Sequence, residues 1–414
     1  MHNRFDLIIV GGGAAGFFAA IHTVEKRPDI RVAIIEKTSQ VLSKVKISGG
    51  GRCNLTNACT EPQELIEFYP RGQKELLSAF YRFNTADTMN WFLQKGVLLY
   101  AQDDGRVFPQ SNSSQTIIDC FLKQAEKYKI QLQLQLNTQI TEIKKENNLF
   151  ILNTKQGINY SSTCLLLATG GSLHLSAYSF LNSFQHEIIP PVPSLFTFNL
   201  PQNNITSLMG LSMPEVCLQI KDTPFVSTGP MLITHWGVSG PVVLKLSAIA
   251  ARYLAEKKYC FIFSINWLNE EKSTDASNEL KLFKKQMSGK TISSTNPFHI
   301  PARLWMFLTT KAAIPLGRTY ADIRKEEIEK LSELLTNDIY EARGKTTFKE
   351  EFVTAGGVSL KEINFKTMES KKTKNLFFAG EVLDIDGLTG GFNFQAAWTT
   401  AFIASETITE RLKL

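Results

Sequence analysis

The alternation of apolar and polar residues at the start of the chain predicts a strand, a helix and a second strand. Residues 5–10 form a short apolar run typical of a buried strand, residues 14–26 have helical periodicity, and residues 31–35 form another apolar strand. This order predicts a βαβ unit. The apolar run from Leu7 to Ile21 is interrupted by glycines and too short to cross a bilayer, so we expect no membrane span and no targeting segment.

The later pattern predicts one discontinuous domain with a different domain inserted into it. Helical segments are expected at residues 63–83, 85–95 and 114–127. A meander or crossover ribbon of alternating strands is expected over 131–160, and buried strands at 164–168 and 375–378, before a last helix at 394–412. The middle has β-like segments at 196–200, 216–220 and 259–265, then helices with polar linkers at 270–278 and 288–296. We therefore predict an α/β fold with a Rossmann-like domain (1–194 and 348–414) and an inserted domain (195–347) with a β part and a helical part.

A glycine pattern opens the first helix. Gly11, Gly13 and Gly16 have the G-x-G-x-x-G spacing, and Glu36 ends the second strand 20 residues after Gly16. Glycines let the backbone approach a pyrophosphate, which the helix N-terminus attracts, while the acid accepts hydrogen bonds from a ribose 2′-OH. The carboxylate would repel a 2′-phosphate, so we do not expect NADP at this site. The alternative is a helix packed tightly on a strand through its glycines alone, and FAD and NAD share the pattern.

A second segment near the C-terminus favours FAD. After the strand at 375–378 the chain continues as Ala379-Gly380-Glu381, then Asp384 and Asp386, then Gly390-Gly391 before the last helix. An acid here suits a ribityl hydroxyl, and a helix N-terminus suits the flavin edge that gains negative charge on reduction. An ordinary glycine-rich turn with solvated acids is the alternative.

These motifs resemble those of the FAD-binding family that includes BaiN-type bile-acid dehydro reductases and aminoacetone-oxidase-like proteins. The resemblance runs along nearly the whole chain, and its most specific segments are SGGGRCN and GEVLDIDGLTGGFN. The matching segments are IIVGGGAAG (8–16), KVKISGGGRCNLTN (44–57), GRVFPQSN (105–112), LLLATGG (165–171), THWGVSGPVVL (234–244), TAGGVSLKEIN (354–364), TMES (367–370) and FFAGEVLDIDGLTGGFNFQAAW (377–398).

The resemblance implies a two-dinucleotide-binding-domain-like FAD fold with an inserted β-barrel and a small helical lid. It also implies that residues at matching positions touch FAD, from the ADP half at the first loop to the flavin at the C-terminal segment. The cofactor-binding residues expected are Gly11, Gly13, Ala14, Ala15, Gly16, Glu36, Lys37, Lys44, Ser48, Gly49, Gly50, Arg52, Cys53, Asn54, Ile140, Ala168, Thr169, Gly170, Gly380, Glu381, Asp386, Gly391, Phe392, Asn393, Gln395 and Ala396.

Few side chains are candidates for acid–base chemistry. His235 is the best catalytic candidate because imidazole titrates near neutral pH, although a His beside Trp236 can equally be a packed residue. Cys53 is a possible redox thiol, but no cysteine lies at Cys-x-x-Cys spacing from it, which favours packing. Arg52 and Arg106 are candidates for binding an anionic substrate, with bracing of a loop or a turn as the alternative for each.

The charge and cysteine content narrow the function class. The 414 residues carry a formal net charge of +6, a mild excess that does not demand nucleic acid, and we expect neither a nucleic-acid nor a membrane partner. Six scattered cysteines without metal-ligand spacing indicate reduced thiols in a cytoplasmic protein, with no metal site expected.

The function predicted from the sequence is a flavoprotein oxidoreductase that reduces a small organic substrate by hydride transfer through flavin N5, using NAD(P)H. No second G-x-G-x-x-G is present, so the nicotinamide is expected to bind transiently. The alternatives are an FAD-dependent oxidase of a small amine or ketone, a flavoprotein that modifies tRNA, and a non-catalytic flavin-binding regulator. The oligomeric state is left open.

Overall fold

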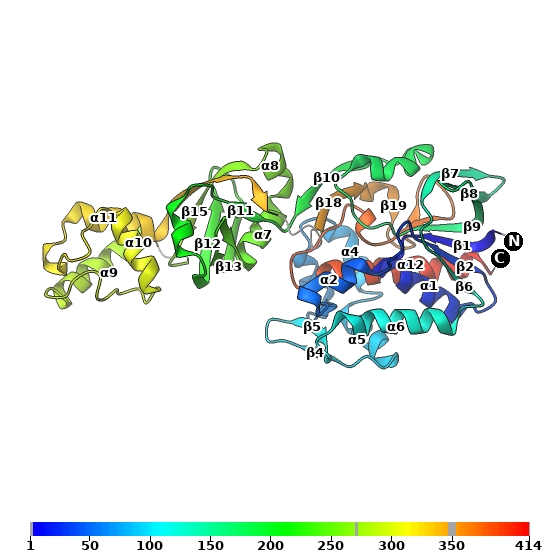
Figure 1. Ribbon diagram of the computed structural model, residues 1–414, viewed down its shortest axis with the longest axis horizontal. Coiled ribbons are helices and arrows are strands. Elements are labelled where there is room, and N and C mark those ends of the chain that lie inside the picture. Colours follow the sequence, from blue (N-terminus) through cyan, green and yellow to red (C-terminus); the bar gives the residue numbers. More distant parts are fainter. Residues whose placement is uncertain (1–2, 270–271, 347–352, 414) are drawn as a thin grey trace. The chain divides into compact units, whose positions relative to one another are not determined.

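The computed structural model of the protein describes residues 3–269, 272–346 and 353–413 (Figure 1). The chain divides into two compact units. The first is built from both ends of the sequence, Met1–Pro193 and Lys349–Leu414, and the second is the continuous segment Ser194–Phe348. Among the described residues, no helix combines the length and the apolar character that a membrane crossing requires.

A mainly parallel sheet forms the centre of the first unit. Its strand order is β19-β20-β21-β9-β1-β2-β6, in which β21, β9, β1, β2 and β6 are parallel. The central strands are almost wholly apolar because both faces of a parallel sheet are covered. The strand bounds are β1 Arg4–Val10, β2 Val32–Ile35, β6 Leu132–Gln135, β9 Asn159–Leu167, β19 Ile363–Asn364, β20 Glu369–Ser370 and β21 Leu376–Phe378.

The meander predicted over residues 131–160 is wrong for its first strand. β6 pairs in parallel with β2, with Leu132 beside Val32 and Leu134 beside Ile34, so it is the edge of the main sheet. Its alternating pattern is that of a half-covered edge strand, which periodicity cannot distinguish from a hairpin strand. Only β7 (Ile140–Glu146) and β8 (Leu149–Thr154) form the antiparallel ribbon, which continues into β9.

Two helices from opposite ends of the sequence pack together in this unit. Helix α1 (Ala14–Lys26) lies beside α12 (Phe392–Arg411), and Nε2 of His22 lies 2.6 Å from Oε1 of Glu406. The positions predicted for α1, α5 (Thr85–Gln94), α6 (Ser114–Lys127) and α12 are confirmed to within about two residues.

The single helix predicted over residues 63–83 is wrong. The segment contains α3 (Pro62–Leu65), a 3₁₀ turn (Ile66–Phe68) and α4 (Gln73–Phe80). Pro70 and Gly72 interrupt it, since proline breaks helical pairing and Gly72 has φ +87°. The interruption turns Arg71 toward Asp386, with which it forms an isolated β-bridge.

The second unit contains an antiparallel sheet that closes on itself. β16 pairs with β15 and β17 pairs with β11, and only Gly344 separates β16 from β17. Gly344 N donates to Tyr259 O (2.8 Å) while its own carbonyl accepts from Asn199 N (3.2 Å), which joins the two ends of the sheet and makes it a small barrel. The strand bounds are β11 Thr197–Asn199, β12 Ser212–Ile220, β13 Val226–Ile233, β14 Gly237–Ser239, β15 Cys260–Asn266, β16 Asp338–Arg343 and β17 Lys345–Thr346.

The helices of this unit share the core of the barrel. Leu304, Trp305 and Leu308 belong to the same buried cluster as Ile205 and Phe263 of the barrel part. The helix bounds are α7 Pro241–Ile249, α8 Ala251–Glu256, α9 Ser273–Gln286, α10 Ala302–Lys311 and α11 Lys325–Thr336. The polar linker predicted over 270–278 is wrong from residue 273 onward, where α9 begins, and residues 270–271 lie outside the described residues.

Candidate cofactor-binding site

The turn after β1 requires glycine at two positions for steric reasons. Gly11 has φ +115°, and a Cβ added there would lie 2.2 Å from the carbonyl oxygen of Ala168, which follows β9. A Cβ at Gly16 would lie 2.0 Å from the carbonyl oxygen of Gly11. The turn is therefore held tightly against the ends of two strands of the parallel sheet.

The N-terminus of α1 opens onto uncrowded space. Gly13 is the N-cap, the helix has no side-chain cap and no acidic residue in its first turn, and a Cβ at Gly13 would contact no atom within 4 Å. The first N–H groups of a helix lack partners inside the helix and carry a partial positive charge. Ala14 and Ala15 add only methyl groups here, so this end of the helix fits a pyrophosphate.

Glu36 is held in a fixed orientation beside this turn. Its Oε2 accepts from Gly12 N (2.9 Å), and its Oε1 accepts from the backbone N and the hydroxyl of Thr38 (2.9 Å each). Thr138 N donates to the Glu36 carbonyl (2.9 Å), which brings the start of β7 at Ile140 close to the acid. The neighbouring Lys37 is exposed.

Glu36→Ala should lower the affinity for FAD by about tenfold or more without unfolding the protein, because the variant loses a charged acceptor for the ribose. Glu36→Gln, which keeps one acceptor oxygen, should lose less. Flavin bound per protein after gel filtration, with the thermal midpoint as the folding control, measures both. Wild-type flavin content in Glu36→Ala would remove the ribose assignment.

A second helix N-terminus belongs to the same unit. Gly391 caps α12 with φ +92°, and a Cβ there would lie 2.3 Å from the carbonyl oxygen of Thr56. The Asn54 amide joins the two segments, since its nitrogen donates to Thr56 O (3.1 Å) and its oxygen accepts from Gly391 N (3.0 Å). Asn393 holds the preceding turn through two hydrogen bonds with Gly387 (2.8 and 2.9 Å). The SGGGRCN loop and the C-terminal motif, far apart in the sequence, are thus fixed to each other.

Lys44 and Glu381 also meet across a long sequence separation. Lys44 Nζ lies 2.5 Å from Glu381 Oε2, and the other carboxylate oxygen accepts from Thr354 N (2.9 Å). A Cβ at Gly171 would collide with Thr354 and Glu381, at 2.6 and 2.8 Å. The ATGG segment that begins at Ala168 is therefore packed against this ion pair.

Three expected cofactor residues have structural partners for their side chains. Asp386 has a fully buried side chain that forms two hydrogen bonds with the Arg71 guanidinium. Gln395 is fully buried and bonds to the hydroxyls of Thr56, Thr88 and Thr399 (2.6, 2.9 and 3.0 Å). Arg52 lies over the Phe108 ring (4.4 Å), a cation–π contact that is compatible with bracing of the loop and leaves its contact with FAD a prediction. The sequence did not identify Arg71 as a residue of this region, because its partner Asp386 is 315 residues away.

The Cys53 side chain is buried, and burial raises the pKa of its thiol to about 12. We therefore expect Cys53 to resist thiol reagents at pH 8 in the folded protein, because the thiolate is the reactive form. The exposed Cys260 should react and serve as the internal control. Mass mapping after treatment with Ellman's reagent measures both, and rapid labelling of Cys53 in folded protein would restore its redox alternative.

Arg106 and His235, the candidates for substrate chemistry, lie in different environments. Arg106 is paired with Asp104 (2.7 Å), which makes it a residue that pins a turn. His235 is exposed and packs edge-on against Trp236, at 4.3 Å between ring centroids. It lines a pocket of about 850 Å³ that lies wholly within the second unit.

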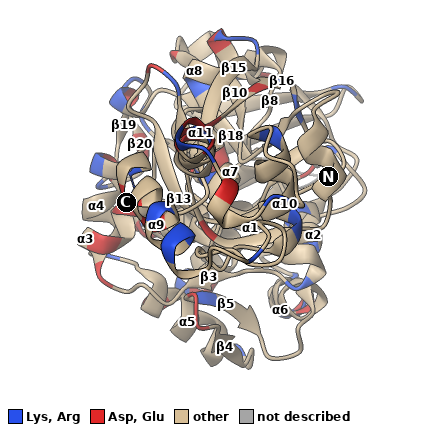
Figure 2. Ribbon diagram, turned by 90° about the vertical axis from the view of Figure 1, so that its left-hand side faces the viewer, with Lys and Arg blue, Asp and Glu red and all other residues tan. Residues whose placement is uncertain are grey.

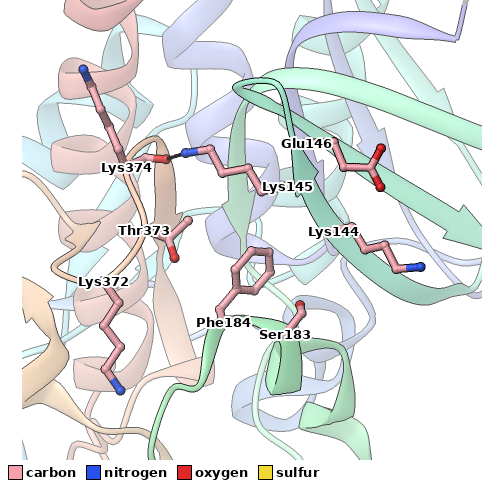
Figure 3. Close-up of a pocket in the computed structure, with 8 residues that line it drawn as sticks. All are labelled: Lys144, Lys145, Glu146, Ser183, Phe184, Lys372, Thr373 and Lys374. Carbon is pink, nitrogen blue, oxygen red and sulfur yellow. Dashed lines mark hydrogen bonds between the residues drawn. The ribbon is translucent and has the colours of Figure 1, made fainter.

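A basic pocket of about 440 Å³ in the first unit is separate from the helix ends described above (Figure 3). Lys144 and Lys372 pair with Glu142 and Glu362 (3.0 and 2.5 Å), and Lys145 Nζ donates to the carbonyl of Lys374 (2.6 Å). Residues 372–374 precede β21 whereas Gly380 follows it, so this pocket lies at the other end of that strand. This pocket therefore contributes nothing to the expected FAD-binding site.

The residues present fit FAD. Both helix N-termini lack side-chain caps, and added Cβ atoms at Gly50 and Gly51 would contact nothing within 4 Å. The Thr354 hydroxyl, buried beside Glu381, has no hydrogen-bond partner in the described part of the chain, as expected of a group that faces a polar ligand. Direct contact with FAD stays a prediction for each expected residue. No group of three or more metal-ligating side chains is found within residues 3–269, 272–346 and 353–413.

Comparison with known proteins agrees with this assignment. The family described as HI0933-like protein Rossmann domain matches residues 5–407. A ribosomal RNA dihydrouridine synthase from Escherichia coli (strain K12) is 28% identical over 98% of this chain and 98% of that protein. The enzyme of the same name from Haemophilus influenzae is 27% identical, covering 99% and 100%. A 3-dehydro-bile acid delta(4,6)-reductase from Clostridium scindens is 24% identical, covering 97% and 98%.

Solved structures show the same fold at low sequence identity. A 3-ketosteroid delta1-dehydrogenase from Sterolibacterium denitrificans superposes with a TM-score of 0.53 at 11% identity, covering 99% of this chain and all of that one. A 3-ketosteroid-delta4-(5alpha)-dehydrogenase from Rhodococcus jostii gives a TM-score of 0.52 at 11% identity, covering 98% and 97%. The predicted α/β fold and the resemblance to BaiN-type reductases are confirmed, and the chain belongs to the HI0933-like Rossmann-domain family of FAD-dependent oxidoreductases.

Proposed function

We propose that the protein reduces a carbon–carbon double bond conjugated to a carbonyl, with NAD(P)H as the electron source and FAD as the carrier. The observation that carries this proposal is the pair of uncapped helix N-termini beside the Lys44–Glu381 pair, in a family of FAD-dependent oxidoreductases. The names of the full-length relatives support the reaction type. Forming dihydrouridine saturates the uracil double bond beside a carbonyl, and a delta(4,6)-reductase saturates ring double bonds of a bile acid.

A bound FAD would supply the chemistry of hydride transfer at N5. The chain's own residues prepare that chemistry by electrostatics. The uncapped N–H groups of α1 would hold the pyrophosphate, and those of α12 would stabilise negative charge at the flavin edge. Glu381, kept in place by Lys44 and Thr354 N, would accept hydrogen bonds from the ribityl hydroxyls. His235, the catalytic candidate from the sequence, belongs to the second unit, and its role as a proton donor stays a prediction.

A uridine in ribosomal RNA is the second candidate for the substrate, beside a small unsaturated ketone. Two relatives named for that reaction cover at least 98% of both chains and are more similar to this one than the bile-acid reductase is. Lys and Arg residues are interspersed with Asp and Glu in both units rather than gathered on one element (Figure 2). This mixed distribution of charge does not decide between the two substrates. The expectation of no nucleic-acid partner stays a prediction, and measuring which substrate is reduced tests it.

The proposal predicts that purified protein, FAD and NADH or NADPH add two hydrogens to an unsaturated substrate. The substrates to compare are undermodified ribosomal RNA and a cyclic enone, with products identified by mass spectrometry. Gain of two hydrogens by either supports the reaction type and selects the substrate. If neither gains hydrogen while oxygen consumes the flavin electrons, an oxidase replaces the reductase.

A further inference from the structure

We propose that the pocket around Arg303 and His235 is a nucleotide-binding subsite that holds one phosphate and one base of single-stranded RNA. This inference rests on the proposed reduction of an unsaturated carbonyl and chooses between its two candidate substrates. The pocket is formed by the second unit alone and has a volume of about 850 Å³. Its lining residues are Gln202, Asn203, Asn204, Thr206, Ser207, Met209, His235 and Arg303.

The pocket stands on a rigid base. Arg303 projects from the first turn of α10, and its Nη2 donates to the carbonyl of Ser207 (2.9 Å). Ile205 and Leu208, which flank lining residues, belong to the same buried core as Leu304 and Trp305 of α10. The barrel part and the helical part therefore hold their polar side chains at a fixed spacing, as a preformed binding site requires.

The charge of the pocket favours an oxyanion. Arg303 and His235 bring cationic or N–H-donating groups, and none of the lining residues is acidic. The bond to Ser207 uses one N–H of the guanidinium, which has five, so the others can bind two phosphate oxygens in parallel. The start of α10 has no side-chain cap and no acidic residue in its first turn, which adds to the positive potential beside Arg303.

The neutral lining favours a nucleobase over a steroid-like ring system. Gln202 and Asn204 are exposed side-chain amides, each with donors and an acceptor that match the alternating C=O and N–H groups of the uracil edge. Met209, 56% exposed, is the one apolar side chain among the lining residues and offers a contact for the base face. A fused hydrocarbon ring system would need predominantly apolar walls.

The test measures binding of a fluorescein-labelled oligouridylate to the full-length, FAD-loaded protein by fluorescence anisotropy, without turnover. Arg303→Ala should weaken binding by about tenfold. The matched control is Arg343→Ala, which removes the same charge from the same unit at an exposed residue paired with Glu341, and should change binding less than about twofold. Flavin absorbance and the thermal midpoint confirm folding of each variant.

A second arm tests recognition of the base. The Gln202→Ala/Asn204→Ala double variant should lose the preference for oligouridylate over oligocytidylate while retaining most of its affinity, because the phosphate contacts remain. Equal weakening by Arg303→Ala and Arg343→Ala overturns the subsite. Unchanged RNA binding in Arg303→Ala, with a raised KM for a carboxylated enone, assigns the pocket to a small acid and also overturns it. Absence of turnover would contradict the proposed reaction but leaves this binding comparison interpretable.

Discussion

Gly13→Asp should produce a folded protein that no longer retains FAD. Gly13 has the extended backbone of an N-cap, and a Cβ there meets no atom within 4 Å, so an aspartate fits without strain. Its carboxylate would accept hydrogen bonds from the free N–H groups of α1, which stabilises the cofactor-free protein by about a few tenths of a kcal/mol relative to glycine. The same carboxylate would occupy and repel the pyrophosphate position, so we expect FAD affinity to fall by about a hundredfold, ~2.7 kcal/mol.

The opposite signs of the two effects make this variant informative. Flavin fluorescence titration measures affinity, and thermal denaturation of cofactor-free protein measures stability. Gly289→Asp is the matched control, because it adds the same charge at a glycine with equally open surroundings in the other unit. Wild-type affinity in Gly13→Asp would mean that the N-terminus of α1 does not hold the pyrophosphate.

Arg71→Ala should be the most destabilising single change under the C-terminal glycine turn. Asp386 has no exposed side-chain surface and Arg71 only 10%, so removing the cation leaves a buried carboxylate without its charged partner. Breaking such a pair costs about 3–5 kcal/mol, which corresponds to a fall of roughly 10 °C in the thermal midpoint. Flavin content should fall as well, since Asp386 fixes the approach to Gly390 and Gly391.

Replacing both partners separates the charge from the packing. Arg71→Met/Asp386→Leu should recover most of the lost stability, because the buried charge disappears along with its partner. If the double variant instead loses the sum of the stabilities lost by Arg71→Met and by Asp386→Leu alone, the two side chains act through different neighbours.

The sequence predicted the parts of the fold that depend on local spacing. The βαβ unit and the Gly11–Gly16 turn follow from short-range patterns, and the structure explains them by close contacts that exclude any Cβ at Gly11 and Gly16. The register of β6 could not be predicted, because a half-polar edge strand has the same alternation as a hairpin strand.

The sequence motifs predicted which residues belong to the site. They did not predict which partner each side chain contacts. Asp386 lies in one of the two most specific segments and Gln395 lies two residues after it, yet their side chains bond to other protein side chains, Asp386 to Arg71 and Gln395 to Thr56 and Thr88. Lys44 and Glu381 were both expected, but not as partners, since 337 residues separate them. Arg303 was missed because an isolated arginine in a helical segment has no sequence signal.

Anaerobic double-mixing stopped-flow spectroscopy tests the central claim, that FAD in this protein passes electrons to an unsaturated carbonyl. The flavin absorbance is followed first with NADH or NADPH and then with undermodified ribosomal RNA or a cyclic enone. We predict that the absorbance bleaches in the first mix and recovers in the second without oxygen. A flavin that stays oxidised with both nicotinamides, or that recovers only when oxygen is admitted, would contradict the account.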